Sequence, residues 1–224
     1  MAKMKLFTML VWHDRTVENA FEVYKESKKS MCKDWGCKDI GIPKADIEKL
    51  ISTIKADHNT TYMEMMGSTE QDFVNTANFA VKAKINVVIG GKYYDSVANI
   101  LKENSIEYYP FIGELVGNPR VLKGTIEDIV KEAKTTAKKN VSGVTVAIYR
   151  FNGDKEALLN KLNSEIDAKI VVAGSVNSKE RVQELAKNGI YGITIGSSFF
   201  QKDFVKDGSF ADNVDECLNW IKEA

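Results

Sequence analysis

Two apolar runs of the sequence contain charged side chains that need partners. Lys38 and Asp39 interrupt the run "CKDIGI", and Glu64 stands between methionines in "TTYMEMM". A charge inside a buried strand is costly unless it is paired or faces a polar opening. A desolvated lysine can form a Schiff base with a keto-sugar, and a carboxylate in such surroundings can act as a general base. Lys38, Asp39 and Glu64 are therefore candidate catalytic residues, with plain ion pairs between Lys38 and either acid as the alternative.

Other polar side chains directly follow apolar runs. His13 and Asp14 come after "KLFTMLVW", where a histidine can serve as acid or base near neutral pH and a carboxylate can contact substrate. In the alternative, Asp14 caps a helix starting near Thr16 and His13 is an ordinary loop residue. Lys92 and Arg150 also follow apolar runs. We expect both cations to contact an anionic substrate, Arg150 through a carboxylate or a second phosphate.

Two turns of small residues near the C-terminal end carry neither an acid nor a base. Gly174-Ser175 follows "AKIVVA", and Gly196-Ser197-Ser198 follows "YGITI". Glycine lets a backbone approach an anion closely, successive N–H groups favour negative charge, and the serine hydroxyls add donors. The turns therefore predict binding rather than bond-breaking, unless the glycines only turn the chain into the following helix.

The elements that position these residues alternate regularly along the chain. Apolar runs of the kind found in buried parallel strands occur at residues 5–12, 37–42, 60–66, 85–91, 106–113, 143–149, 168–174 and 191–197. Stretches with helical spacing of apolar residues separate them, for example Ile126, Ile129, Val130 and Ala133. Ser68, Thr125 and Ser178 are placed to cap three of these helices.

This order predicts an α/β protein with eight strands and eight helices in strict alternation. An open doubly wound sheet is an alternative, but the regular unit lengths and the 224 residues favour a single (βα)₈ TIM barrel spanning residues 1–224. No Ser/Gly-rich linker marks a domain boundary.

In such a barrel the active site lies at the carboxyl ends of the strands, and phosphate is often held after strands seven and eight. The two small-residue turns fall at these two positions, which favours a phosphate site there. The loop after the fifth strand carries Glu114, Asn118 and Arg120, and we expect it to form part of the mouth.

The segment "VVAGSV…SKERVQELAKNGIYGITIGSSFF" resembles the last two βα units of the phosphate-binding (βα)₈ barrels. This group includes ribulose-phosphate-binding barrels, barrels of tryptophan and histidine biosynthesis, and phosphosugar aldolases and epimerases. The resemblance covers the last quarter of the chain. It implies that Gly174 and Ser175 hold one side of a phosphate, and Gly196 and Ser197 the other.

The chain departs from two activities within that group. Aldolases of the 2-keto-3-deoxy-6-phosphogluconate type place their Schiff-base lysine on strand six, where this chain reads "GVTVAIYRF". The decarboxylase and hexulose-phosphate synthase type carries Asp-x-Lys-x-x-Asp on strand three, where this chain reads "YMEMMG". Neither activity is transferred by the resemblance.

Composition narrows the class of partner. Lys plus Arg and Asp plus Glu both number 31, so no basic excess supports nucleic-acid binding. The three cysteines have no CxxC spacing, as expected of a reduced cytoplasmic protein, and no apolar stretch approaches membrane-spanning length. A homo-oligomer is compatible with the sequence.

The pattern predicts an enzyme for a small phosphorylated sugar or sugar acid that abstracts a proton beside a carbonyl. Such an enzyme is a lyase of the aldolase kind, or an isomerase or epimerase. Glu64 would be the base, Lys38 the carbonyl-activating group and His13 a second acid or base. A non-catalytic regulatory barrel that binds a phosphorylated metabolite is the alternative. No cofactor is predicted, although a divalent metal held by Asp14, Asp39 and Glu64 is a third possibility.

Overall fold

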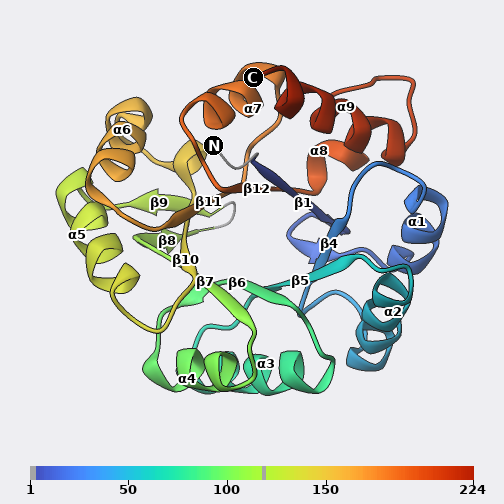
Figure 1. Ribbon diagram of the computed structural model, residues 1–224, viewed down its shortest axis with the longest axis horizontal. Helices are drawn as coiled ribbons and strands as arrows, with labels where there is room; N and C mark the ends of the chain where they lie inside the picture. Colours follow the sequence, from blue (N-terminus) through green and yellow to red (C-terminus); the bar gives the residue numbers. More distant parts are fainter. Residues whose placement is uncertain (1–3, 118–119) are drawn as a thin grey trace.

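The computed structural model describes residues 4–117 and 120–224, and its centre is a closed barrel of parallel strands. Figure 1 shows helices arranged around the strands. The strands follow the chain around the barrel: β1 (Lys5–Met9), β4 (Asp34–Lys38), β5 (Thr60–Met65), β6 (Val87–Lys92), β7 (Glu107–Phe111), β10 (Gly143–Val146), β11 (Lys169–Ala173) and β12 (Gly192–Ile195). Closure comes from the pairing of β1 with both β4 and β12, which confirms the predicted eight-stranded (βα)₈ barrel.

Helices connect successive barrel strands, and the last unit has two of them rather than the predicted one. In the described part of the chain they are α1 (Ala20–Ser27), α2 (Lys44–Ala56), α3 (Glu70–Lys82), α4 (Asp95–Glu103), α5 (Ile126–Ala137), α6 (Lys155–Glu165), α7 (Lys179–Lys187), α8 (Ser197–Phe200) and α9 (Phe210–Glu223). Thr125 and Ser178 accept backbone N–H bonds at the starts of α5 and α7, as predicted, whereas α3 is capped by Thr69 and not by Ser68. No helix among the described residues is long and apolar enough to cross a membrane.

Two small antiparallel hairpins on the strand-to-helix connections are absent from the sequence-based prediction. One pairs β2 (Val11–Trp12) with β3 (Arg15–Thr16) directly after β1, and the other pairs β8 (Glu114–Val116) with β9 (Val121–Lys123) after β7. The predicted first strand, 5–12, therefore ends at Met9. Asp14 does not cap a helix near Thr16, because α1 begins at Ala20.

In two other predicted strands, the difference in bounds changes where a candidate residue lies. The second barrel strand is Asp34–Lys38 rather than 37–42, so Lys38 ends the strand instead of lying inside it. The sixth ends at Val146, and a short 3₁₀ helix, η1 (Ile148–Arg150), carries Arg150 away from it. In both cases an apolar run continued beyond the last residue of the strand.

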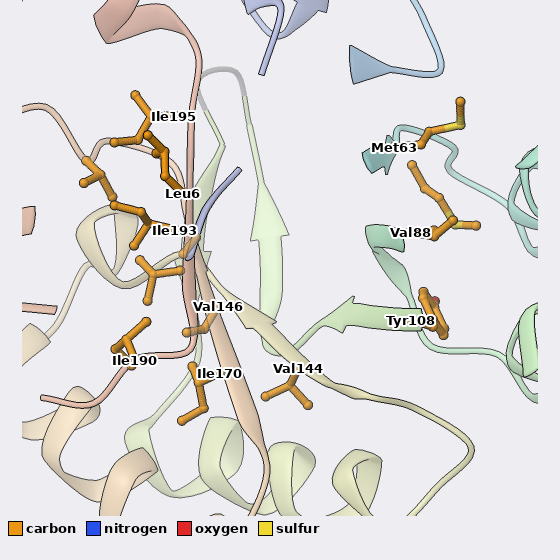
Figure 2. Close-up of a cluster of buried hydrophobic side chains, with 14 of the residues drawn as sticks. Leu6, Met63, Val88, Tyr108, Val144, Val146, Ile170, Ile190, Ile193 and Ile195 are labelled. Atoms are coloured by element: carbon orange, nitrogen blue, oxygen red, sulfur yellow. The ribbon is translucent and has the colours of Figure 1, made fainter. Parts of the chain in front are cut away.

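The core has two parts because strand residues alternate between the two faces of the barrel wall. Outward-facing side chains pack beneath the helices in one large cluster, of which Figure 2 shows Leu6, Met63, Val88, Val144, Ile170 and Ile193 among others. Inward-facing side chains fill the barrel itself, namely Phe7, Tyr62, Val87, Ile89, Tyr109 and Val171. The barrel is thus a filled core, and free space is left at its carboxyl-end mouth.

Candidate active site

Lys38 lies at the mouth of the barrel, at the end of β4, between two carboxylates. Its amine donates to Asp14 Oδ1 at 3.0 Å and lies 3.2 Å from Glu64 Oε1. The Lys38 side chain is 5% exposed and that of Glu64 is 11% exposed, so this contact is almost fully removed from water. The arrangement brings together Lys38 at the end of β4, Glu64 on the neighbouring β5 and Asp14 from the hairpin after β1, all three of which the sequence singled out.

Alternation along β4 explains why Lys38 reaches the mouth. Lys38 is two residues beyond Gly36, whose Cα faces the Tyr62 side chain inside the barrel, so both residues point inward. On the adjacent strand β5, Glu64 is the direct register partner of Lys38. Neighbouring residues of two parallel strands therefore place the amine and the carboxylate side by side.

Asp14 reaches this site from the first hairpin. The hydroxyl of Thr16 donates to the carbonyl of Lys38 at 2.8 Å and accepts from the Lys38 N–H at 2.9 Å. Gly41 passes so close to the Thr16 backbone that a Cβ at that position would lie 2.2 Å from the Thr16 oxygen. These contacts attach the hairpin to the end of β4 and hold Asp14 over Lys38.

The charges around Asp14 favour its ionised form. Burial acts to raise the pKa of Asp14, but Lys38, then Arg150 and finally Arg120 lower it, and the net pKa lies below its ordinary value. The carboxylate thus forms one side of an ion-pair network with Lys38 and, at 4.0 Å, with Arg150.

The site opens into a pocket of about 220 Å³. Its lining includes the three charged residues above, both small-residue turns and two arginines: Met9, Asp14, Lys38, Glu64, Phe111, Leu115, Arg120, Ala147, Arg150, Ala173, Gly174, Ser175, Val176, Asn177, Thr194, Ile195, Gly196, Ser197, Ser198 and Gln201. The candidate catalytic lysine and the candidate phosphate-binding residues therefore share one cavity.

The turn at Gly174 is built around Arg150. Gly174 has φ +86°, and a Cβ on it would lie 2.6 Å from Arg150 Nε, so a larger residue here would displace the guanidinium. Arg150 Nε donates to Ser175 Oγ at 3.4 Å. From α7, Arg181 donates to the Ser175 carbonyl and to Asn177 Oδ1, which fixes the shape of the turn.

The turn at Gly196 packs against the first strand and its hairpin. A Cβ on Gly196 would lie 2.6 Å from the carbonyl oxygen of Val11 and 2.8 Å from that of Met9. Close backbone packing alone therefore requires glycine here, whether or not a ligand binds. Ser197 and Ser198 open the four-residue helix α8 and line the pocket, and the Ser198 hydroxyl is 3.5 Å from the Val176 carbonyl.

Asp39 does not join the site. It follows Lys38 directly and faces the opposite side of the wall, where it accepts from Thr76 Oγ1 on α3 at 2.6 Å and from the Met66 N–H at 3.0 Å. Burial raises its pKa, although these hydrogen bonds act in the other direction. The metal set of Asp14, Asp39 and Glu64 is likewise not assembled. Among residues 4–117 and 120–224, no three His, Cys, Asp or Glu side chains are grouped to hold a metal ion.

Two other predicted residues lie outside the pocket lining. His13 is exposed at the tip of the first hairpin and stacks on the ring of Trp12, with centroids 4.8 Å apart. Lys92 ends β6 and lines a neighbouring recess. Neither is in contact with the Lys38 amine in the structure.

Arg120 is the charged residue of the described pocket lining to which sequence reasoning gave no specific role. It follows the described part of β8 and approaches the mouth from the second hairpin, together with Leu115. The only signal for it was a charged loop after the fifth barrel strand. Asn118, the other polar residue expected in that loop, lies outside the described residues.

Comparisons with known proteins bear on the fold. By sequence, no family model and no curated protein matches the chain. Solved structures do match. A native KDPGal structure has a TM-score of 0.71 and 11% identity, with 100% of this chain and 97% of that chain covered. Tryptophan synthase from M. tuberculosis, in a ligand-free form, has a TM-score of 0.69 and 12% identity, covering 98% and 94%.

Phosphoribosylanthranilate isomerase from Thermotoga maritima, in a monomeric form of the dimeric enzyme, is a third match. Its TM-score is 0.67 at 11% identity, and the alignment covers 99% of this chain and 100% of that one. At these identities the likeness shows the fold. The resemblance read from the last quarter of the sequence therefore extends over the whole chain as a shared architecture, and the chain has the (βα)₈ fold of these proteins.

Proposed function

We propose that the protein is an enzyme that acts on a small phosphorylated sugar or sugar acid by abstracting a proton next to a carbonyl. The observation that carries this proposal is the buried Lys38 amine between Asp14 and Glu64, in one cavity with the glycine-serine turns after β11 and β12. The chain shares its fold with phosphoribosylanthranilate isomerase and tryptophan synthase, and because a fold alone does not set the chemistry, the proposal rests on this site.

The substrate phosphate would bind at Gly174, Ser175, Gly196 and Ser197, with the Arg150 guanidinium beside it. Backbone N–H groups at such turns suit an anion, and arginine suits a phosphate in particular. This anchor would leave the carbonyl carbon over the ends of β4 and β5. The anchor and the reacting groups are then at opposite sides of one small cavity.

At the reacting end, Glu64 would remove the proton on the carbon beside the carbonyl. Lys38 would activate the carbonyl in one of two ways. As an ammonium it would hydrogen-bond to the carbonyl oxygen; as a neutral amine, after passing a proton to a neighbouring carboxylate, it would form an imine with the carbonyl carbon and release the oxygen as water. Asp14 holds the amine from the opposite side and orients it. The enolate or enamine formed in this way is reprotonated on the neighbouring carbon in isomerisation, and it adds to an aldehyde in the synthetic direction of an aldolase. In the cleavage direction Glu64 would instead take the proton of the β-hydroxyl, and the breaking C–C bond would supply the same carbanion equivalent, so both a lyase and an isomerase are consistent with the site.

Proton exchange tests the proposal without knowledge of the natural substrate. Dihydroxyacetone phosphate and glyceraldehyde 3-phosphate are incubated with the protein in deuterated water, and NMR follows exchange of the hydrogen beside the carbonyl. We expect enzyme-dependent exchange that falls at least ~100-fold in Glu64→Gln, as for loss of a general base. The matched control is Glu22→Gln, an exposed position on α1, which should retain the wild-type rate.

Trapping with borohydride in the same mixtures distinguishes the two roles of Lys38. A reduced adduct located on Lys38 by mass spectrometry would indicate an imine, and exchange without an adduct would indicate an ammonium. If neither of these compounds nor a phosphorylated 2-keto sugar acid exchanges although they bind, the protein is a binding barrel and not an enzyme of this class.

A further inference from the structure

Arg120 is the one arginine that reaches the mouth from the second hairpin. Its side chain lines the main pocket and also an adjoining recess, and Phe111 and Leu115 are the other two residues common to both. The recess continues from the pocket toward the ends of β5 and β6, where Lys92 contributes a second cation. Arg120 thus lies at the boundary between the pocket and the recess.

The surroundings of Arg120 differ from those of the other two pocket cations. Lys38 is paired with two carboxylates, and Arg150 has Asp14 at 4.0 Å. Among the described residues, no carboxylate oxygen lies within 4.0 Å of the Arg120 guanidinium. A half-buried guanidinium with five N–H donors facing a cavity is suited to bind an anionic group.

The two acids that line the recess, Glu132 and Glu114, do not pair with the Arg120 guanidinium. Glu132 uses Oε2 to accept from the Gly113 N–H at 3.0 Å, which ties it to the base of the hairpin. Glu114 is exposed on β8, where its register partner is Lys123. The two acids of the pocket, Asp14 and Glu64, are paired with Lys38, and Arg120 acts on Asp14 only from beyond 4.0 Å, where it helps to lower its pKa. The pocket side of Arg120 can therefore take an anion supplied by a ligand.

The order of the strands separates Arg120 from the other two binding positions. Around the barrel the phosphate turns follow β12 and β11, Arg120 follows β7, and Glu64 and Lys38 lie on β5 and β4. One strand, β10, stands between β11 and β7, and one strand, β6, stands between β7 and β5. The mouth therefore has three separate binding positions around the barrel. One is for the phosphate, one is for the reacting carbonyl, and one is for the group that Arg120 binds.

We infer that Arg120 binds a carboxylate of the substrate, so that the substrate is a phosphorylated sugar acid and not a phosphorylated neutral sugar. This inference rests on the proposed phosphate site and names the substrate class of that same cavity. The planar guanidinium matches the two oxygens of a carboxylate in a way that a neutral hydroxymethyl group does not. A ligand with anions at both ends would lie across the mouth with its middle carbons over Lys38.

A pair of probes that differ in one group tests the inference. 6-Phosphogluconate and glucitol 6-phosphate have the same six-carbon chain and phosphate, and only the first ends in a carboxylate. Their dissociation constants are measured by calorimetry for the wild type, Arg120→Gln and Arg120→Lys. Lys123→Gln is the control, because it removes the same charge from an exposed position on the same hairpin that does not line the pocket.

We expect the wild type to bind 6-phosphogluconate at least ~10-fold more tightly than glucitol 6-phosphate, as a charge-assisted bidentate bond implies. Arg120→Gln should abolish that preference while leaving glucitol 6-phosphate affinity unchanged, Arg120→Lys should keep part of it, and Lys123→Gln all of it. Equal affinity of the wild type for both probes, or an equal loss of both in Arg120→Gln, would overturn the inference and leave the phosphate site standing. Failure of both probes to bind would overturn the proposed function and this inference with it.

Discussion

The amine of Lys38 and the carboxylate of Glu64 lie 3.2 Å apart on neighbouring strands whose register pairs the two residues directly. Both side chains are almost completely buried, and Asp14 closes the other side of the amine at 3.0 Å. Burying an ion pair of this kind costs desolvation free energy, and apolar side chains at the same positions would make the barrel at least as stable. The pair is therefore better explained by chemistry at the mouth than by stability.

Replacing Lys38 by methionine should destabilise the fold strongly at neutral pH. Glu64 would be left buried without its cation, and breaking a buried ion pair costs about 3–5 kcal/mol. Urea unfolding at pH 7 measures the loss. The exposed pair of Lys82 and Glu48, 2.7 Å apart, provides the control, because Lys82→Met should cost less than about 1 kcal/mol. Equal losses in the two variants would contradict the burial argument.

Asp39 should affect the pH dependence of stability and not ligand binding. Its pKa is raised above 3.8, so the folded protein holds this proton more tightly than the unfolded chain does. The stability that this proton contributes is present below the unfolded pKa and is lost as the pH rises through the folded pKa. Wild-type stability relative to Asp39→Asn should therefore fall as the pH increases from 3.8 upward.

Urea unfolding of both proteins across that range measures this difference. Affinity of Asp39→Asn for phosphorylated ligands should match that of the wild type, since the carboxylate faces α3. A large loss of ligand affinity in a variant that remains folded would show that Asp39 takes part in ligand binding.

The two glycine turns should respond differently to alanine. Gly196→Ala places a Cβ against two backbone oxygens that cannot move aside, so we expect a loss of about 1–3 kcal/mol in unfolding free energy. Gly174→Ala displaces the more flexible Arg150 side chain, which should weaken phosphate binding in addition to the strain at positive φ.

Gly189→Ala is the matched control for Gly174→Ala. Gly189 also has positive φ, +70°, but a Cβ there would contact nothing within 4 Å. It should reproduce the strain without changing ligand affinity. Equal ligand affinity in the two variants would show that the contact of Arg150 with Gly174 plays no part in binding.

The three cysteines should be unreactive while the protein is folded. Burial raises the pKa of Cys32 to about 11 and that of Cys37 to about 12, and it also raises that of Cys217. The thiolate is the reactive form, so a disulfide reagent at about pH 8 should label none of them in the native protein. All three should react after denaturation. Rapid labelling of the native protein would show that one of these segments opens to solvent.

The sequence predicted the repeated strand–helix units of the barrel and missed the two short hairpins. Continuous apolar runs and helical spacing suffice for an eight-unit barrel, and strand ends then locate Lys38, Glu64 and the glycine turns. The separation of Lys38 from Asp39 follows from side-chain alternation, but only once the strand is known to end at Lys38. The apolar run does not mark the end of this strand, because Ile40 and Ile42 continue the run past Lys38, the last residue of β4.

The hairpins were missed for a different reason. Strands of two or three residues, such as β2, β3 and β8, are too short to show a period. The first hairpin is defined by the long-range contact of Thr16 with Lys38, 22 residues away. Arg120 belongs to the second, so its place in the pocket could not be read from neighbouring residues.

The central claim is that the mouth of the barrel binds phosphorylated compounds, and its most direct test is the melting temperature with matched ligands. Phosphorylated sugars and sugar acids are compared with their unphosphorylated counterparts, using wild type and Gly174→Ala. A ligand at about 100 times its dissociation constant stabilises the folded state by about 2.7 kcal/mol, which is readily measured. The account predicts a rise confined to phosphorylated compounds and reduced in Gly174→Ala. No rise with any phosphorylated compound, or an equal rise with the unphosphorylated ones, would contradict it.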